Sequence, residues 1–320
     1  MSETQPAGAV AIGVDVGATV IKAGLVGLDG ELLASFREHS PRTTSALRDF
    51  VCSVRGKATG AVLGIGIGCK GVIDAATTRV NSLPGDLNFL EGCTLRELAG
   101  MDGLLVVADN DARTALVAEV LWGAAQGRHN VVLLTLGTGV GGAALVNGMI
   151  LRGFSGAACH FGHMTLDMRG GLCICGNYGC LETCFSSRAI ESSYSAHIHR
   201  ASPTLLSLDS DGRIPTTEAV FQAAADGDPS ARRVLDLAFE SLTAALVSLL
   251  HIFDPELLIF GGNIAAAGPQ LLAPLHEEVG RRTRVLLGRK VPIVLQSTIG
   301  YGGVAGAAGL VFLQQQLLTI

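Results

Sequence analysis

The stretch from Gly153 to Thr183, GFSGAACHFGHMTLDMRGGLCICGNYGCLET, is the part of the sequence around which the rest of the chain is organised. It contains one histidine and three cysteines within eighteen residues, namely His163, Cys173, Cys175 and Cys180. Three thiolates and one imidazole form the ligand set of a tetrahedral structural zinc site with no open position for a substrate. The spacing His-x₉-Cys-x-Cys-x₄-Cys is not a finger or ribbon pattern, so free core cysteines in a glycine-rich turn remain the alternative.

Upstream, the segment from Val10 to Leu28, VAIGVDVGATVIKAGLVGL, predicts two strands joined by a glycine turn. Asp15 lies at the end of the first strand, and Gly17 and Thr19 belong to the turn. This arrangement suits Mg²⁺ and phosphate, because the carboxylate can orient a metal-bound water while the turn amides hold phosphate oxygens. A purely structural hairpin is the alternative for so short a motif.

The segment from Asn130 to Val146, NVVLLTLGTGVGGAALV, repeats this layout around a second turn of Gly137, Thr138 and Gly139. Two strand–turn–strand units about 120 residues apart predict an internally duplicated fold, in which each copy holds one side of a nucleotide. A third glycine pair, Gly261 and Gly262, follows the apolar residues 257–260, and a plain strand-to-helix turn is its alternative explanation.

Polar residues follow a third apolar run, between the two turns. Residues 104–108 are continuously apolar, as in a central strand that is covered on both faces. Asp109, Asn110 and Asp111 come directly afterwards, and residues 112–125 predict a helix. One short carboxylate there can serve as an N-cap, but two carboxylates and an amide exceed what a cap requires. Because phosphoryl transfer to an alcohol needs a base, Asp111 is the candidate catalytic residue.

The composition narrows the class of protein. A net charge of −5 and a pI near 5.9 provide no general attraction to nucleic acid or to an anionic membrane. No apolar run is expected to reach membrane-spanning length, and the first ten residues lack the features of a secretory signal. Eight cysteines in 320 residues do not resemble a disulfide scaffold. We therefore expect a cytoplasmic protein without nucleic-acid or membrane partners.

These motifs together resemble the ROK family of bacterial sugar kinases and sugar-responsive repressors. The pattern G-x-A-x-x-x-G-H, followed by C-x-C-G-x-x-G-C-L-E, carries the resemblance, and similarity extends from residue 11 to about residue 310. The resemblance implies an α/β fold, namely the duplicated actin/ribonuclease H-like kinase fold of two lobes with an active-site cleft between them. It implies a small lobe over residues 1–118, a large lobe over 119–303, a terminal helix over 304–320 that packs back on the small lobe, and a homodimer.

The resemblance also implies roles for individual residues. Zinc would hold the loop that carries sugar-binding residues, with His163 serving both zinc and sugar. Glu182 would contact the sugar near its anomeric end, and the turn at Gly261 and Gly262 would lie beneath the adenosine of ATP. The family's E-N-D-A motif is matched at 109–112, so Asn110 would bind a sugar hydroxyl and Asp111 would face the hydroxyl that is phosphorylated.

Departures from the family pattern cluster in the expected sugar pocket. The family's G-E-x-G-H has histidine in place of glutamate at His160, its P-G pair is Lys70-Gly71, and its P-N-L is Asn81-Ser82-Leu83. A carboxylate only accepts hydrogen bonds, whereas a neutral imidazole donates one and accepts one. In the first turn, Ala18 replaces a glycine and Val20 a lysine, for which Lys22 is the candidate substitute.

We therefore expect an ATP- and Mg²⁺-dependent kinase that phosphorylates a hydroxyl, by preference O6, of a hexose or amino-hexose such as N-acetylmannosamine or kanosamine. An ordinary glucokinase is one alternative, and a sugar-sensing regulator without catalysis is another. Only about ten residues precede the first predicted strand, too few for the helix-turn-helix of the family's repressors, so DNA binding is not expected.

Overall fold

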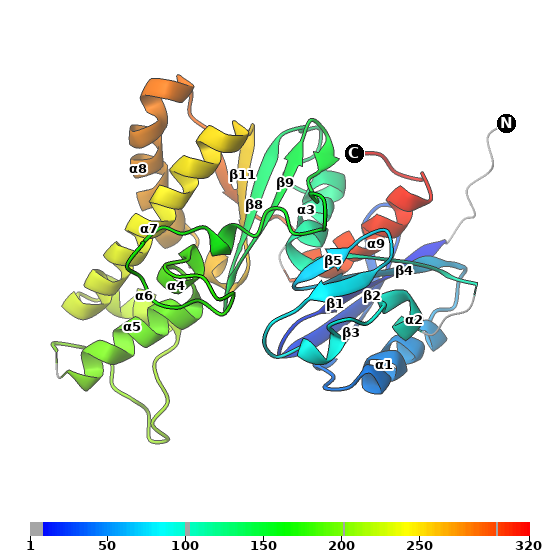
Figure 1. Ribbon diagram of the computed structural model, residues 1–320, viewed down its shortest axis with the longest axis horizontal. Coiled ribbons are helices and arrows are strands. Elements are labelled where there is room, and N and C mark those ends of the chain that lie inside the picture. The colour runs from blue at the N-terminus through cyan, green and yellow to red at the C-terminus, as the bar shows by residue number, and fades with distance from the viewer. Residues whose placement is uncertain (1–8, 100–102, 201, 299) are drawn as a thin grey trace. The chain divides into compact units, whose positions relative to one another are not determined.

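The computed structural model describes residues 9–99, 103–200, 202–298 and 300–320, which divide into two compact units (Figure 1). Unit 1 comprises Met1–His129, Ala143–Cys159 and Gln296–Ile320, and unit 2 comprises Asn130–Gly142 and His160–Leu295. The lobe boundaries expected after residues 118 and 303 stay a prediction.

Unit 1 is built on a five-stranded sheet in the order β3-β2-β1-β4-β7. Its strands are β1 (Val10–Val16), β2 (Val20–Val26), β3 (Leu32–His39), β4 (Val62–Cys69) and β7 (Leu105–Asn110). The first three strands are antiparallel neighbours, and β4 runs parallel to both β1 and β7. The carboxyl ends of β1, β4 and β7 therefore lie side by side, and each is followed by predicted site residues.

Helices cover both faces of this sheet. The side chains of α1 (Thr44–Gly56) and α2 (Leu95–Ala99) pack with one face, and α9 (Gly302–Gln314), which itself packs on α3 (Asp111–Trp122), covers the other (Figure 1). The α9 backbone touches the strands directly, since a Cβ at Gly66 would lie 1.7 Å from the Ala307 carbonyl oxygen. The last helix, α9, begins at Gly302 and ends at Gln314, whereas the terminal helix was expected over 304–320.

The second five-stranded sheet has the order β10-β9-β8-β11-β12. Its strands are β8 (Val131–Leu136), β9 (Val140–Val146), β10 (Met149–Ile150), β11 (Leu257–Gly261) and β12 (Ile293–Leu295). As in the first sheet, one edge is antiparallel and the other is parallel. β10 is antiparallel to β9, and β11 is parallel to both β8 and β12. This repeated order confirms the duplicated α/β fold. A small hairpin, β5 (Val72–Asp74) and β6 (Arg79–Ser82), is added in unit 1.

Unit 2 is otherwise helical. Its elements are η2 (Phe161–His163), α4 (Leu181–Cys184), α5 (Ser187–His199), α6 (Thr217–Ala225), α7 (Pro229–Phe253), η3 (Asn263–Ala267) and α8 (Pro269–Leu287). The expectation that no apolar run reaches membrane-spanning length needs a correction, because α7 passes that test by length and composition. This is weak evidence for a membrane span: eleven α7 side chains are buried, and the helix packs against α5, α6 and α8, as a core helix does.

Candidate active site

Asp15 lies at the carboxyl end of β1, directly before the first glycine turn. In the β1–β2 hairpin it is paired with Lys22. A Cβ at Gly303 would lie 2.9 Å from the Asp15 carboxyl carbon, so the start of α9 packs closely on this group. Burial, together with the charge of Asp111, raises the pKa of Asp15 to about 6, although Lys22 opposes the shift. The carboxylate is an oxygen donor of the kind that Mg²⁺ and its waters prefer, so the residues present fit that ion.

The turn after Asp15 is tight, and its glycine has a steric reason. A Cβ at Gly17 would lie 2.6 Å from the carbonyl oxygen of Val20. Lys22, the candidate for the missing family lysine, donates from Nζ to the Gly300 carbonyl at 3.2 Å. It therefore ties β2 to the residues that precede α9.

Asn110 and Asp111 form the junction between β7 and α3. Asn110 is the N-cap of α3: its side-chain oxygen accepts from the Ala112 N–H at 3.0 Å, and its Nδ2 donates to the Gly71 carbonyl at 3.1 Å. Asp111 also accepts from the Ala112 N–H, at 2.9 Å. Although Asp111 keeps some exposed area, burial raises its pKa, and the Ala112 hydrogen bond and the charges of Lys70 and Arg113 oppose that rise.

Three further predicted sugar-site residues, Lys70, Gly71 and Ser82, meet this junction. The register of β4 and β7 pairs Cys69 with Asn110, so Lys70 and Asp111 follow from neighbouring strand ends. Gly71 has a φ of 93°, and a Cβ there would lie 2.4 Å from the Ser82 carbonyl oxygen. The structure thus brings together the predicted sugar and base residues of unit 1.

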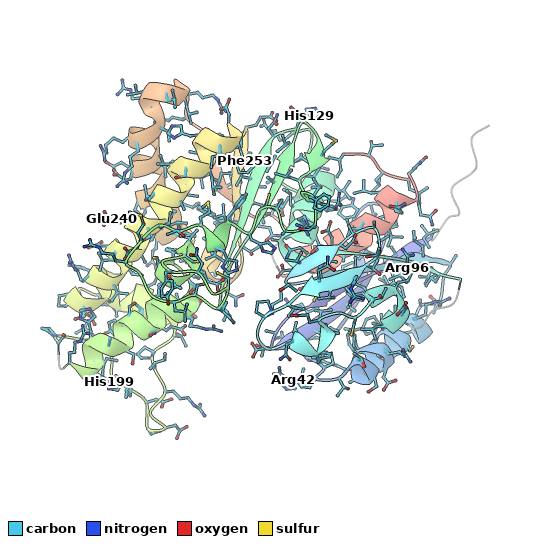
Figure 2. All side chains as sticks on the ribbon, viewed as in Figure 1. Arg42, Arg96, His129, His199, Glu240 and Phe253 are labelled. Atoms are coloured by element: carbon cyan, nitrogen blue, oxygen red, sulfur yellow. The ribbon has the colours of Figure 1, made fainter. Side chains whose placement is uncertain are left out.

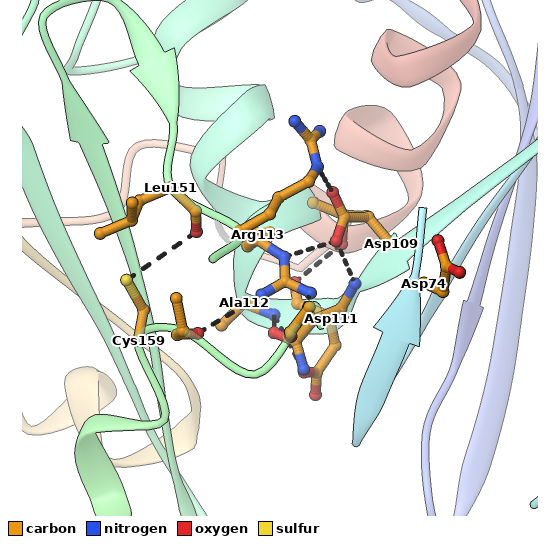
Figure 3. A network of polar contacts seen from close by, with 12 residues as sticks. Asp74, Asp109, Asp111, Ala112, Arg113, Leu151 and Cys159 are labelled. Carbon is orange, nitrogen blue, oxygen red and sulfur yellow. Dashed lines mark hydrogen bonds and ion pairs between the residues drawn. The ribbon is translucent and has the colours of Figure 1, made fainter. Parts of the chain in front are cut away.

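Behind the junction lies a buried charge cluster that the sequence analysis missed (Figure 3). Asp109 is fully buried and accepts from Arg113, which is also fully buried, and from Arg152 Nε at 2.7 Å. Arg113 also donates to the carbonyls of Gly156 at 3.1 Å and Ala158 at 3.4 Å. The ion pair of Asp109 and Arg113 thereby holds the loop at residues 156–158, which leads to His160. The i, i+4 spacing of Asp109 and Arg113 is a sequence signal, but it usually marks an exposed helical pair.

In unit 2, the second and third glycine turns lie at neighbouring strand ends. Gly137 N–H donates to the Gly139 carbonyl at 3.0 Å, which closes the turn around Thr138. β11 is parallel to β8, with Gly261 paired to Thr135, and Gly262 has a φ of 84°. A Cβ at Gly262 would lie 2.3 Å from the Leu136 carbonyl oxygen. The two turns predicted for phosphate and adenosine are therefore adjacent.

The four predicted metal ligands converge in unit 2. The ligand atoms of His163, Cys173, Cys175 and Cys180 all lie within 4.8 Å of one another. The Cys175 and Cys180 sulfurs are 3.7 Å apart, and Cys173 Sγ is 3.5 Å from His163 Nδ1. Tetrahedral zinc with typical bond lengths gives edges of about 3.8 Å between sulfurs and about 3.6 Å between sulfur and nitrogen. The donor set and its spacing fit Zn²⁺.

The same loop carries the remaining sugar-site candidates, His160, His163 and Glu182. The rings of His160 and His163 have centroids 6.1 Å apart. Phe253 lies at the end of α7 (Figure 2). The ring of Phe161 in η2 packs edge-on against it, with centroids 5.5 Å apart. Glu182, in α4, directs Oε2 to the Val140 N–H at 2.9 Å, a contact to the second phosphate turn that the sequence did not reveal.

The family model described as "ROK family" matches residues 11–314 of this chain. The chain belongs to the ROK family. A relative named glucokinase from Thermotoga maritima is 30% identical over 94% of this chain and 96% of its own length. Another, named N-acetylmannosamine kinase, from Escherichia coli, is 29% identical over 80% of this chain and 84% of its own length.

A solved ROK structure resembles this one across nearly the whole chain. It is a ROK glucokinase from Streptomyces griseus in complex with glucose and AMPPNP, with a TM-score of 0.80 and 32% identity over 94% of this chain and 98% of that one. These relatives confirm that this ROK protein is a sugar kinase and that its fold is the two-domain actin-like one. The Streptomyces griseus structure contains AMPPNP, an analogue of ATP, beside glucose.

Proposed function

We propose that this sugar kinase transfers the γ-phosphoryl group of ATP to a hydroxyl, by preference O6, of a hexose or amino-hexose, with Asp111 as the general base. The observation that carries the proposal is the β7–α3 junction, where Asn110 caps the helix and bonds to Gly71 beside a partly buried Asp111. A base with a raised pKa accepts a proton more readily at neutral pH than an ordinary aspartate does.

The proposed step needs little covalent help from the protein. The proton of the sugar hydroxyl moves to an Asp111 carboxylate oxygen. The sugar oxygen forms a bond to the γ-phosphorus, and the bond from that phosphorus to the bridging oxygen of ADP breaks. Asn110 orients the sugar, and Asp15 with the turns at 17–19 and 137–139 holds the phosphates. When bound with ATP, Mg²⁺ neutralises charge on the phosphate oxygens.

The substrate is the finer part of the proposal. His160, Lys70 and Ser82 replace residues of the ordinary glucokinase pattern, and Lys70 and Ser82 lie beside Gly71 at the sugar junction of unit 1. We infer that the substrate is a hexose that differs from glucose at carbon two or three. N-Acetylmannosamine and kanosamine are the compounds that test this. The family likeness to a relative named N-acetylmannosamine kinase supports including that sugar.

We further propose that zinc, bound by His163, Cys173, Cys175 and Cys180, holds the sugar loop, as the ligand spacing supports. When bound, the ion supplies a cross-link between the two ends of the loop, while His163 and Glu182 act on the sugar. We also propose that the protein is a cytoplasmic homodimer. The two lobes expected over residues 1–118 and 119–303, with the active-site cleft, are part of the same proposal.

The decisive experiment is a coupled assay of ADP release with ATP and Mg²⁺. The panel consists of glucose, mannose, N-acetylmannosamine, glucosamine and kanosamine, and product NMR locates the phosphorylated hydroxyl. We expect turnover with at least one of these sugars and phosphate on O6. Sugar binding by calorimetry without turnover on any sugar would instead favour a sugar sensor without catalysis, the alternative that Ala18 and Val20 leave open.

A further inference from the structure

The carboxylate of Glu182 lies against the second phosphate turn. Its Oε2 accepts the Val140 N–H at 2.9 Å, directly after Gly139. A Cβ at Gly139 would lie only 2.4 Å from the same oxygen, so the absence of a side chain there permits the approach. The turn is also held by the Ser187 N–H, which donates to the Gly137 carbonyl at 2.8 Å. Both hydrogen bonds involve residues that closely follow Cys180, the last of the four predicted zinc ligands.

The two oxygens of the Glu182 carboxylate differ in their hydrogen bonding. Oε2 is engaged by the turn, whereas Oε1 lies 3.7 Å from the Gly139 Cβ position and accepts no hydrogen bond from the residues that the structure describes. A carboxylate has acceptor sites on both oxygens, so Oε1 retains its capacity for a donor. In a sugar kinase the obvious donor is a sugar hydroxyl.

We propose that Glu182 couples the sugar site to the second phosphate turn, with one oxygen on a sugar hydroxyl and the other on the Val140 N–H. A sugar on Oε1 restricts rotation of the carboxylate, which keeps the amide of Val140, and with it Gly137–Gly139, in the conformation that receives phosphate. The affinity for nucleotide then rises when sugar is bound, and by linkage the affinity for sugar rises by the same factor. This inference rests on the proposed function, in which both ligands bind this unit.

The first test measures binding of AMPPNP with Mg²⁺ alone, by calorimetry, to the native protein, Glu182→Gln and Glu182→Ala. Glutamine keeps an oxygen acceptor for the Val140 N–H, and alanine removes it. We expect Glu182→Ala to bind AMPPNP about tenfold more weakly, the effect of one hydrogen bond to a charged group, and Glu182→Gln to stay within about twofold of native.

Glu191→Ala is the matched control. Glu191 also accepts a backbone N–H, that of Thr217 at 2.8 Å, through a half-buried carboxylate of unit 2 on α5. Its loss should lower stability by a similar amount and leave AMPPNP affinity unchanged. If Glu182→Ala binds AMPPNP as the native protein does, or if the control weakens AMPPNP equally, the positioning role is wrong.

The second test repeats the AMPPNP titration with a saturating sugar, the one of the panel above that gives turnover. We expect sugar to tighten AMPPNP binding at least about fivefold in the native protein and by a factor near one in Glu182→Ala. Coupling that is absent from the native protein, or that persists in Glu182→Ala, overturns the inference while leaving the kinase intact. If no sugar of the panel gives turnover and none binds, the proposed function itself fails, and the coupling with it.

Discussion

At the scale of single residues, Asp111 has a structural task that the hydrogen bonds show and a catalytic task that we propose, and one substitution can separate the two. Its side chain accepts the Ala112 N–H at the start of α3, a hydrogen bond that asparagine can also accept. The asparagine cannot take a proton from a sugar hydroxyl. We therefore expect Asp111→Asn to bind sugar and fold normally while kcat falls by roughly 10²–10⁴-fold. Steady-state kinetics, with sugar binding by calorimetry, checks this.

Asp74→Asn is the control for that experiment. Asp74 lies in β5 of the same unit and accepts the Ala76 N–H at 2.9 Å in an ordinary turn (Figure 3). Its substitution should leave kcat within about twofold of native, because surface changes of this kind are nearly neutral. Near-native turnover in Asp111→Asn would make that residue a helix cap only, and the base would have to be another group.

His160 is the residue on which sugar preference is expected to depend. A glutamate here, as in the family pattern, can accept hydrogen bonds from two neighbouring hydroxyls, which one imidazole cannot reproduce. Losing a well-placed hydrogen bond in a desolvated pocket costs about 1–3 kcal/mol, or roughly 5- to 150-fold in specificity. His160→Glu should therefore raise the ratio of kcat/KM for glucose to that for the preferred sugar. If the native enzyme already prefers glucose and the ranking does not change, this substitution has no role in specificity.

At the scale of elements, apolar runs and glycine turns predicted the strands and their duplication, because each strand is short and bounded by glycine or a polar residue. The predicted turns at 17–19, 137–139 and 261–262 fall at strand ends as expected. What local pattern could not reveal was pairing across the chain. The Arg113 bonds to the loop at 156–158 and the Glu182 bond to Val140 join residues about 40 apart, which only the tertiary fold brings together.

If zinc is bound as proposed, the stability of the loop over residues 163–180 depends on four ligand side chains, His163, Cys173, Cys175 and Cys180. Cys175→Ser should remove zinc, because three ligands bind a structural ion far more weakly than four. We expect about one zinc per native chain and little in the variant, a lower Tm, and a sugar KM at least about tenfold higher. Atomic absorption and thermal unfolding measure the first two.

Cys52→Ser provides the comparison, since Cys52 is an exposed thiol on α1 in unit 1. It should keep its zinc, Tm and KM. A native protein that contains no zinc yet is fully active would exclude a structural role for the metal, and the cluster would then be read as free thiols.

At the scale of the whole molecule, the candidate site concentrates acidic groups where they cost stability. Asp15 and Asp111 both have raised pKa values, mainly because burial disfavours their charged forms. The charge of Asp111 also raises the pKa of Asp15, and both charges raise the pKa of Cys69. In the proposed function, the charge of Asp15 that destabilises the free protein helps to bind Mg²⁺, and the charge of Asp111 accepts a proton. The expected consequence is a trade between stability and activity.

Asp15 makes this trade measurable through pH. Its folded pKa of about 6 exceeds the ordinary value of 3.8, so the folded state holds the proton more tightly than the unfolded state. The favourable contribution of the protonated group is complete below pH 3.8 and is lost as pH rises through 6, a loss of about 3 kcal/mol. Asp15→Asn cannot ionise, so in buffer without Mg²⁺ it should be more stable than the native protein by about that amount at pH 8 and by about half as much at pH 5. Urea unfolding at both pH values measures the difference, and the variant should have almost no kinase activity. A stability gap that stays the same from pH 5 to pH 8 would show that ionisation of Asp15 is not its cause.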